Sequence, residues 1–190
     1  ILLKAFEEVK PNLILTVPLI LEKIYKKMIL PQLSKTTMKV ALNIPLLDSR
    51  IYAQIRKKLV DAFGGRFREV IVGGAAMNEE VTNFLYKIKF PFTIGYGMTE
   101  CGPLISYDHN DEYVPGSCGQ ILKGIMKVRI DSEDPYNKVG EIQVSGENVM
   151  KGYYKNEEAT SKVFTEDGWL RTGDLGTCLL YTSDAAEDLT

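Results

Sequence analysis

The chain has 190 residues, with 23 lysines and arginines, 25 aspartates and glutamates, one histidine and a formal net charge of −2. That length suits one domain or two small ones, and 45% hydrophobic with 25% charged residues is an ordinary globular composition, which argues against a disordered or disulfide-scaffold protein. The near-neutral charge provides no basic surface for nucleic acid, and the longest apolar stretch, at residues 13–21, is too short to span a bilayer.

The first two-thirds of the chain alternate between strand-like and helix-like segments. Residues 12–17 predict a short strand, and Pro18 predicts the start of an amphipathic helix that continues to about residue 28, because proline suits the first helical turn. A second helix is predicted from Asp48 to about residue 63, where Gly64 and Gly65 end it.

The same alternation continues with a strand at 67–72, a tight turn at 73–76, a helix at 79–88 capped by Asn78, and a strand at 92–95. Strands that alternate with helices predict an α/β fold with a parallel, Rossmann-like sheet. Ligands bind at the carboxyl ends of the strands in such sheets, and two glycine-bearing loops follow those ends here.

After about residue 103 the pattern changes. Short strands are predicted at 127–130 and 141–144, and frequent glycines separate them, which favours an antiparallel, β-barrel-like subdomain. We therefore expect a partial α/β subdomain at residues 1–105 and a partial β-barrel-like subdomain at 106–177.

The loop at 95–100 has the richest chemistry. Tyr96 is able to stack on a flat ring, the Thr99 hydroxyl to donate to a phosphate oxygen, and the Glu100 carboxylate to bind Mg²⁺, which prefers hard oxygen ligands. Together they describe one end of a nucleotide site. The spacing alone describes a glycine turn with a surface threonine and glutamate equally well.

Two further loops offer weaker signals. The small residues at 73–76 would let a planar ligand approach the backbone, although no phosphate-binding G-x-x-x-x-G-K-[ST] sequence occurs in the chain. Asp174, which lies between Gly173 and Gly176, could accept hydrogen bonds from two sugar hydroxyls. The first loop is equally explained as a tight turn, and Asp174 as an aspartate in a β-turn. For each loop, a binding role and a plain turn both remain possible interpretations of the sequence.

The three cysteines are widely spaced and form no C-x-x-C pair, so we expect reduced thiols in a cytosolic protein. A nucleophile pair of Cys101 or Cys118 with His109 is the alternative, but nothing nearby resembles an activated-thiol motif. His109 itself lies among acidic residues, which favours a solvated loop. Trp169 is expected to pack rather than to stack on a ligand.

Five segments recur in the order of a known family. They are GGAA at 73–76, YGMTE at 96–100, a GEI segment at 140–146, KGYY at 151–154 and TGD at 172–174. Together they resemble the core motifs of the adenylate-forming superfamily of acyl-CoA synthetases, adenylation domains and luciferases. Residues 10–25 resemble the long-chain fatty acid–CoA ligase branch in particular.

The resemblance implies ATP, Mg²⁺ and coenzyme A as cofactor and co-substrates, and a fatty acid as the acid that is activated. It implies that Glu100 binds Mg²⁺ and that Thr99 and Glu100 are the catalytic residues. By the same resemblance, the small residues of the loop at 73–76 would line the adenine, Tyr96 would stack on the adenine ring, and Asp174 would hold the ribose hydroxyls. The nucleotide-binding set implied is Gly74, Ala75, Ala76, Tyr96, Gly97, Thr99 and Asp174.

The resemblance also implies segments outside this chain, namely a phosphate-binding loop before Ile1 and a small lysine-bearing domain after Thr177. We therefore expect a fragment of a larger enzyme that releases no pyrophosphate by itself. The larger enzyme is expected in the cytoplasm, with peripheral membrane contact and no transmembrane segment. Residues 178–190 resemble translated sequencing adapter, so we expect a non-native tail there.

Three other functional readings remain open from the sequence. One is another adenylate-forming enzyme that activates an aryl or amino acid, since the acyl pocket lies partly outside this chain. The second is a non-catalytic nucleotide- or acyl-binding module. The third is a plain α/β domain whose glycine loops are only turns.

Overall fold

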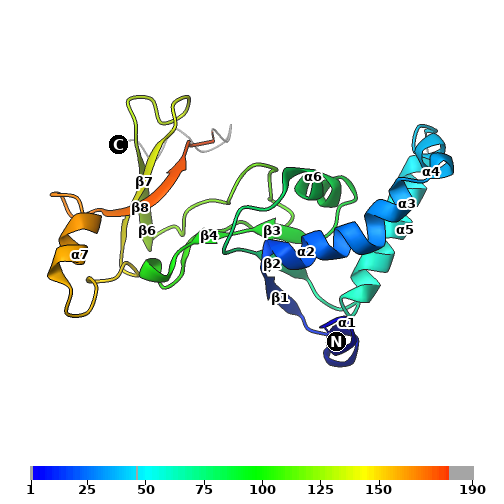
Figure 1. The fold of residues 1–190 in the computed structure, drawn as a ribbon, viewed down its shortest axis with the longest axis horizontal. Coiled ribbons are helices and arrows are strands. Elements are labelled where there is room, and N and C mark those ends of the chain that lie inside the picture. Colours follow the sequence, from blue (N-terminus) through cyan, green and yellow to red (C-terminus); the bar gives the residue numbers. More distant parts are fainter. Residues whose placement is uncertain (1, 46, 180–190) are drawn as a thin grey trace. The chain divides into compact units, whose positions relative to one another are not determined.

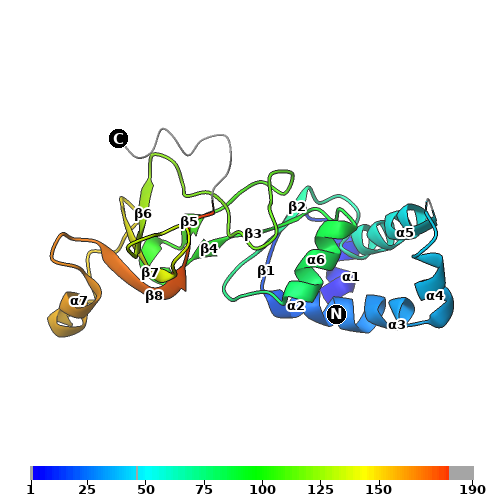
Figure 2. The same cartoon turned by 90° about the horizontal axis from the view of Figure 1, so that it is seen from above.

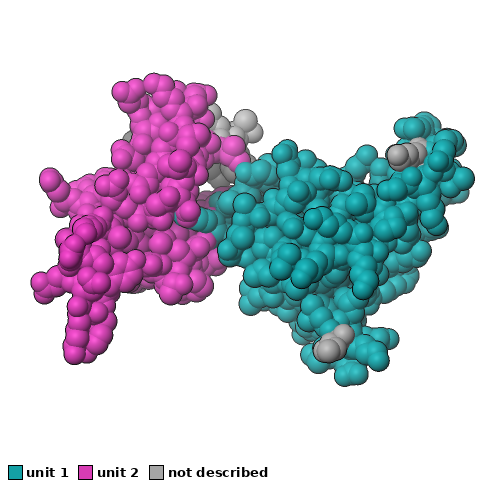
Figure 3. All heavy atoms as spheres, in the orientation of Figure 1, with its two compact units in different colours: residues 1–96, 107–119 teal, residues 97–106, 120–190 magenta. Residues whose placement is uncertain are grey.

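The computed structural model describes residues 2–45 and 47–179. The chain divides into two compact units, shown in different colours in Figure 3. Unit 1 comprises Ile1–Tyr96 and Tyr107–Gly119, and unit 2 comprises Gly97–Ser106 and Gln120–Thr190. The chain therefore passes between the units three times, and each unit is described in turn.

Unit 1 contains most of the helices (Figure 1). In chain order its elements are α1 (Leu2–Val9), β1 (Leu13–Thr16), α2 (Pro18–Ile24), a π-helical turn (Tyr25–Ile29), α3 (Leu30–Leu33), α4 (Thr36–Ala41), α5 (Leu47–Ala62), β2 (Glu69–Val72), α6 (Glu79–Lys87) and β3 (Phe92–Ile94).

The three strands of unit 1 form a parallel sheet in the order β1-β2-β3, which confirms the expected parallel α/β arrangement. Ile14 pairs with Val70, and Val70 pairs in turn with Phe92. Because the strands run in one direction, their carboxyl ends at Thr16, Val72 and Ile94 meet at one edge of the sheet.

One face of this sheet carries the core of unit 1. Helices α2, α5 and α6 lie beside one another next to the strands (Figure 2) and contribute apolar side chains to a single cluster. Its strand residues are Ile14, Val70, Val72 and Phe92, and its helix residues include Leu21, Ile55, Leu59, Val81 and Leu85. On the other face of β1, Leu13 and Leu15 are exposed.

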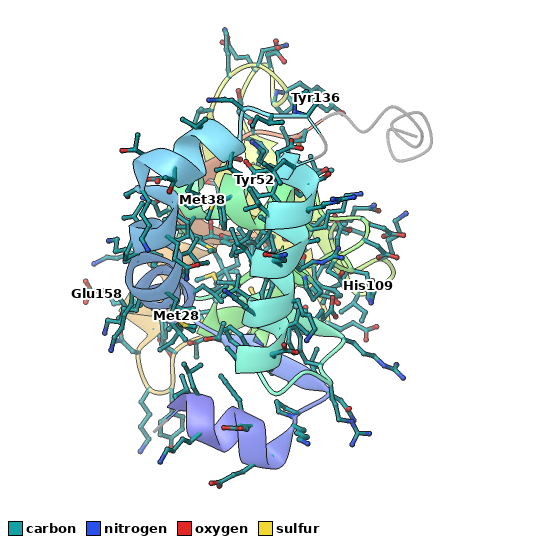
Figure 4. The ribbon with its side chains drawn as sticks, turned by 90° about the vertical axis from the view of Figure 1, so that its right-hand side faces the viewer. Met28, Met38, Tyr52, His109, Tyr136 and Glu158 are labelled. Carbon is teal, nitrogen blue, oxygen red and sulfur yellow. The ribbon has the colours of Figure 1, made fainter. Side chains whose placement is uncertain are left out.

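The helices agree with the sequence where local signals are strong. Asn78 caps α6 as predicted, since its Oδ1 accepts a hydrogen bond from the Val81 N–H at 3.2 Å. Tyr52 of α5, labelled in Figure 4, packs edge-on against Phe84 of α6 with ring centroids 6.4 Å apart. The helix predicted from Pro18 to residue 28 is interrupted by the π-helical turn, which buries Tyr25 and Ile29.

Unit 2 is built on an antiparallel sheet. Its elements are the 3₁₀ turn Thr99–Cys101, β5 (Leu104–Ser106), β6 (Met126–Asp131), β7 (Gly140–Gly146), α7 (Glu157–Val163) and β8 (Leu170–Gly176), while β4 (Tyr96–Gly97) crosses from unit 1 and pairs with β5. The register pairs Val128 with Val144, and Val144 with Leu170. The antiparallel expectation is confirmed.

The barrel-like shape expected for this region needs correction. Within residues 97–106 and 120–179, β6, β7 and β8 form an open three-stranded sheet and β5 pairs separately with β4. Three strands are too few to close on themselves, since even the small OB-fold barrel has five. Strand β8 and helix α7 were not predicted.

The observed division between units also differs from the expected boundary at 105/106. Residues 107–119 return to unit 1 because Glu69, a buried carboxylate at the start of β2, accepts hydrogen bonds from the Tyr107 hydroxyl and from the backbone and side-chain N–H groups of Asn110. The Thr93 hydroxyl of β3 also donates to the Asp108 carbonyl at 2.8 Å.

None of the helices within residues 2–45 and 47–179 is both long enough and apolar enough to cross a membrane. The tail expected to be non-native begins at Cys178, and its residues 180–190 lie outside the described residues.

Candidate functional site

The candidate adenine loop lies at the carboxyl edge of the parallel sheet in unit 1. The Gly73 N–H donates to the Thr16 carbonyl at 3.1 Å, and the Gly95 N–H donates to the Val72 carbonyl at 2.9 Å. A Cβ added to Gly73 would lie 3.5 Å from the Gly95 carbonyl oxygen. The two glycine-bearing loops therefore run side by side, and each follows the carboxyl end of a strand as the sequence predicted.

Small and exposed side chains line this edge. Gly74, Ala75 and Ala76 are exposed, and Tyr96 follows on the neighbouring strand end as a half-buried aromatic residue. Gly74 has a φ of +86°, a left-handed conformation that favours glycine. The structure thus gathers all four of the predicted unit 1 residues at one edge of one sheet.

The candidate phosphate and metal residues lie in unit 2, directly after Gly97. A Cβ added to Gly97 would overlap the Pro103 carbonyl oxygen, so the close approach of these two segments requires glycine there. Thr99 and Glu100 follow in a 3₁₀ turn that Gly102 ends with a φ of +64°. Thr99 is exposed and Glu100 is half-buried.

Residues 148–150, which follow β7, form hydrogen bonds with the backbone of this turn and of the segment after it. The Met150 N–H donates to the Glu100 carbonyl at 2.7 Å. The Asn148 side-chain amide donates to the carbonyl oxygens of Cys101 at 2.6 Å and Leu104 at 2.9 Å. These three hydrogen bonds hold the backbone at Glu100 and in the residues that follow it, and sequence reasoning missed the role of Asn148.

The Glu100 side chain has a partner that the sequence analysis also missed. The Tyr153 hydroxyl donates to Glu100 Oε1 at 2.9 Å, across 53 positions of the chain. That hydrogen bond is the main reason why the pKa of Tyr153 is raised above its usual value, with burial and the negative charge of Glu100 adding to it. The KGYY segment marked this region as a motif, but spacing alone does not connect it to Glu100.

Asp174 lies on a strand rather than in the turn that its glycine neighbours suggest. Between the pairs Gln143–Arg171 and Glu141–Leu175, the ladder of β7 and β8 is irregular, and β8 bulges there. Gly173, with a φ of +76°, donates through its N–H to Glu141 Oε1 at 3.3 Å. Asp174 is exposed, so the bulge presents its carboxylate to solvent.

Glu100 suits a magnesium ion that arrives with a nucleotide. The residues described here contain no group of three or more His, Cys, Asp or Glu side chains that would hold a metal by themselves. Magnesium in nucleotide-dependent enzymes is commonly bound by one or two carboxylates together with substrate phosphates and water. A single half-buried carboxylate beside the exposed Thr99 hydroxyl fits that donor set.

The alternative cysteine–histidine site gains no support. Burial, with a smaller contribution from the Glu100 charge, raises the pKa of Cys101 to about 11, and burial raises the pKa of Cys118. Both thiols therefore stay protonated near neutral pH, the opposite of an activated nucleophile. His109, labelled in Figure 4, is exposed and bonded to Asp111, which is the main reason why its pKa is raised.

An open hollow of about 470 Å³ lies away from these loops, at the amino edge of the parallel sheet. It is lined by residues that precede or begin β1 and β2, together with His109 of the 107–119 segment. Its carboxylate, Glu69, is already engaged by Tyr107 and Asn110. We therefore place the candidate site at the carboxyl edge rather than in this hollow, whose lining residues are Asn12, Leu13, Arg68, Glu69 and His109.

Curated proteins similar to this chain include two classes of acid–CoA ligase. Long-chain-fatty-acid–CoA ligase 1 of Saccharomyces cerevisiae is 30% identical over 187 residues, which cover 90% of this chain and 27% of that protein. 4-Coumarate-CoA ligase 1 of Narcissus pseudonarcissus is 35% identical over 145 residues, which cover 70% of this chain and 26% of that protein. The chain thus spans about a quarter of the length of these relatives.

Solved structures agree with this similarity. ATP-bound MatB from Rhodopseudomonas palustris matches 92% of this chain with a TM-score of 0.63 and 25% identity, and the match covers 30% of that structure. The AMP-bound A-PCP didomain of carboxylic acid reductase from Segniliparus rugosus matches 95% of this chain with a TM-score of 0.65 and 27% identity, covering 24% of that structure. Residues 1–154 match the family model described as AMP-binding enzyme, and the chain therefore belongs to that family.

Proposed function

We propose that this chain is the nucleotide-binding part of an ATP-dependent acid–CoA ligase. In the proposed reaction, a carboxylate oxygen attacks the α-phosphorus of ATP, the bond to the β-phosphate breaks, and pyrophosphate leaves. The thiol of coenzyme A then loses its proton and attacks the acyl carbon, and AMP leaves. The observation that carries the proposal is the pair of glycine-bearing loops at neighbouring strand ends, in a member of the AMP-binding enzyme family.

In unit 1 the exposed small residues are proposed to lie against the adenine. Gly74, Ala75 and Ala76 leave space above the sheet edge for a flat ring, and Tyr96 offers an aromatic face on the neighbouring strand end. Substituting any of the three by a bulky residue would fill that space. The proposed adenine pocket therefore depends on small side chains in a precise place rather than on charged groups.

In unit 2 the polar residues are proposed to handle the phosphates and the ribose. The exposed Thr99 hydroxyl would donate to an α-phosphate oxygen, and Glu100 would hold Mg²⁺, whose positive charge would stabilise the negative charge that develops at phosphorus. Gly97 would let the backbone approach the nucleotide, and Asp174 would accept hydrogen bonds from the ribose hydroxyls.

A fatty acid is our first candidate for the activated acid. The yeast long-chain-fatty-acid–CoA ligase matches 90% of this chain, whereas the Narcissus 4-coumarate-CoA ligase matches 70%. An aryl acid is the second candidate because the second relative has the higher identity, 35% against 30%. A cytoplasmic location and peripheral membrane contact of the longer enzyme remain predictions.

A chimera tests both the reaction and the acid. Residues 1–177 would replace the matching segment of the yeast ligase, and ATP–pyrophosphate exchange would be measured with palmitate and with 4-coumarate. We expect exchange that depends on palmitate, and we expect Glu100→Gln in the chimera to lower it by at least about 100-fold, since an electrostatic contribution of this kind is commonly worth 10²–10³.

A matched control for that chimera is Glu147→Gln, an exposed carboxylate of unit 2, which should leave exchange unchanged. Exchange that depends on 4-coumarate instead of palmitate would favour the second candidate. A folded chimera that binds ATP but exchanges pyrophosphate with neither acid would contradict the proposed reaction.

A further inference from the structure

We propose that Tyr153 is a positioning residue for the Glu100 carboxylate, holding it in the orientation in which it binds the nucleotide's divalent cation. This inference rests on the proposed function of Glu100. It adds a residue that touches neither nucleotide nor metal in the proposed site but acts through the carboxylate that does.

The direct contact is between side chains far apart in the sequence. The Tyr153 hydroxyl donates to Glu100 Oε1 at 2.9 Å. A carboxylate has two oxygens, so Oε2 keeps its lone pairs for a cation while Oε1 is held. A glutamate side chain has three rotatable bonds. A fixed donor on one oxygen limits its conformations, so less conformational entropy is lost when the carboxylate binds a cation.

The backbone of Tyr153 is itself held in place. Its N–H donates to the Thr160 hydroxyl at 2.9 Å, and that hydroxyl donates to the Asn156 carbonyl at 2.8 Å, at the start of α7. A Cβ on Gly152 would lie 2.7 Å from the Thr160 side chain, so glycine allows the chain to pass this close to the helix. Helix α7 therefore holds the backbone of Tyr153 through Thr160.

The backbone of Glu100 is also held in place. Its carbonyl accepts the Met150 N–H at 2.7 Å, and Asn148 bonds the carbonyl oxygens on the following turn. One short segment, residues 148–153, thus fixes both the backbone and the side chain of Glu100. A tyrosine that only filled space would need neither its hydroxyl nor this alignment.

The test uses the 190-residue chain, ATP and Mn²⁺, which replaces Mg²⁺ and is followed by electron paramagnetic resonance. Tyr153→Phe removes only the hydroxyl, and we expect Mn²⁺ affinity in the presence of ATP to fall about tenfold, as is usual when a residue supporting a metal ligand is lost. Tyr154→Phe is the matched control, because this neighbouring tyrosine is 87% exposed, and we expect less than a twofold change.

A spectroscopic measurement separates positioning from general stability. In chain labelled with ¹³Cζ-tyrosine, assigned through the two phenylalanine variants, Glu100→Gln should shift the Tyr153 resonance at neutral pH and leave the Tyr154 resonance in place. Mn²⁺ with ATP should broaden the Tyr153 resonance more than that of Tyr154, because Tyr153 lies beside the proposed ligand. This readout reports on the contact itself in the Glu100→Gln variant, independently of the Mn²⁺ affinity of Tyr153→Phe.

The outcomes distinguish this inference from the proposed function. If Glu100→Gln abolishes Mn²⁺ binding while Tyr153→Phe binds as tightly as the unsubstituted chain, Tyr153 is not a positioning residue and Glu100 keeps its role. If the chemical shift of the Tyr153 resonance does not change in Glu100→Gln, the contact itself is refuted. If the unsubstituted chain binds no Mn²⁺ with ATP, or Glu100→Gln binds it unchanged, the metal role of Glu100 fails and the positioning role fails with it.

Discussion

The loop of unit 1 proposed to bind adenine and the turn of unit 2 proposed to bind phosphate are held in place by different interactions. The loop at 73–76 follows a strand whose Val70 and Val72 are fully buried in a core formed by the sheet and several helices. The turn at 99–101 is held by hydrogen bonds from residues 148–153. Within residues 97–106 and 120–179, the buried apolar residues of unit 2 are Cys101, Ile105, Met126, Val144 and Leu170.

This difference matches what each half is proposed to do. A pocket for a flat ring needs a rigid edge with small side chains, and apolar packing beneath a sheet provides it. A site for phosphates and a cation needs polar side chains at fixed orientations, and hydrogen bonds are directional in a way that apolar packing is not. If this comparison holds, the largest effects are expected from changes in the core of unit 1 and the smallest from the loss of a single hydrogen-bonding side chain in unit 2.

The core of unit 1 should be the most sensitive to truncation. Phe63 is fully buried, and its ring lies 5.3 Å from Phe6, 5.9 Å from Phe67 and 5.7 Å from Phe90, measured between centroids. We expect Phe63→Ala to lower the free energy of unfolding of unit 1 by about 3–5 kcal/mol, because a large buried ring leaves a cavity. Urea unfolding followed by far-UV circular dichroism measures this, since most of the helices described lie in unit 1.

Fluorescence of Trp169, the only tryptophan in the chain, reports on unit 2 in the same experiment. We expect its transition to move little in Phe63→Ala. An equal shift of both signals would show that the two units unfold together, and the contrast between their supports would not extend to their stability.

Alkaline pH should affect the two units in different ranges. Burial and the hydrogen bond to Glu80 raise the pKa of Tyr25 in unit 1 to about 12 from 10.0, and burial raises the pKa of Cys101 in unit 2 to about 11 from 9.0. A raised pKa stabilises the protonated state, so each contribution is complete below the unfolded pKa and is lost as pH rises through the folded one. Each shift corresponds to roughly 2–3 kcal/mol at full ionisation.

The loss is therefore expected between pH 9 and 11 for unit 2 and between pH 10 and 12 for unit 1, measured as urea midpoints by Trp169 fluorescence and by circular dichroism. Cys101→Ala should reduce the first dependence and Tyr25→Phe the second, while other groups with a raised pKa, such as Tyr153 in unit 2 and Cys118 in unit 1, keep the remainder. A pH dependence of unit 1 that persists unchanged in Tyr25→Phe would rule out that side chain as its cause.

Glycine substitutions should separate the two loops. A Cβ on Gly97 would overlap the Pro103 carbonyl oxygen, so we expect Gly97→Ala to destabilise unit 2 by about 1–3 kcal/mol, as overpacking does. Gly73→Ala is the matched substitution in unit 1, where the new Cβ meets the Gly95 carbonyl at an ordinary 3.5 Å, and we expect a change within about 0.5 kcal/mol. Equal effects in the two loops would contradict the close packing assigned to Gly97.

Loss of the Asn148 side chain should have the smallest effect. Asn148→Ala removes two hydrogen bonds to the carbonyl oxygens of Cys101 and Leu104. It also removes Oδ1, which is buried and has no hydrogen-bond partner among residues 2–45 and 47–179. We expect a net loss of about 1 kcal/mol in the stability of unit 2, together with faster amide hydrogen exchange around residues 99–104.

Asn137→Ala is the control for that measurement, because Asn137 is exposed and its amide bonds only the nearby Asp134 at 2.9 Å among the contacts described. It should leave exchange at residues 99–104 unchanged. Unchanged exchange in Asn148→Ala would mean that the turn does not depend on these two hydrogen bonds.

Local sequence signals predicted the elements of unit 1 that position its loops. The strands at 12–17, 67–72 and 92–95 and the helix capped by Asn78 were all predicted, because period, caps and breakers act over a few residues. Strand β8 was not predicted. Its glycines at 173 and 176 are typical of a turn, and only the pairing with β7 holds the segment extended.

The order of the motifs along the chain by itself determined the family and named Thr99, Glu100, Tyr96 and the 73–76 loop as candidates. Only the tertiary structure decided which side chains support them. Tyr153 and Glu100 are 53 positions apart, and Tyr107 and Glu69 are 38 apart. Such contacts depend on how separate segments pack after the chain folds, so no local pattern specifies them, whereas helix caps and strand periods are complete within the segment that carries them.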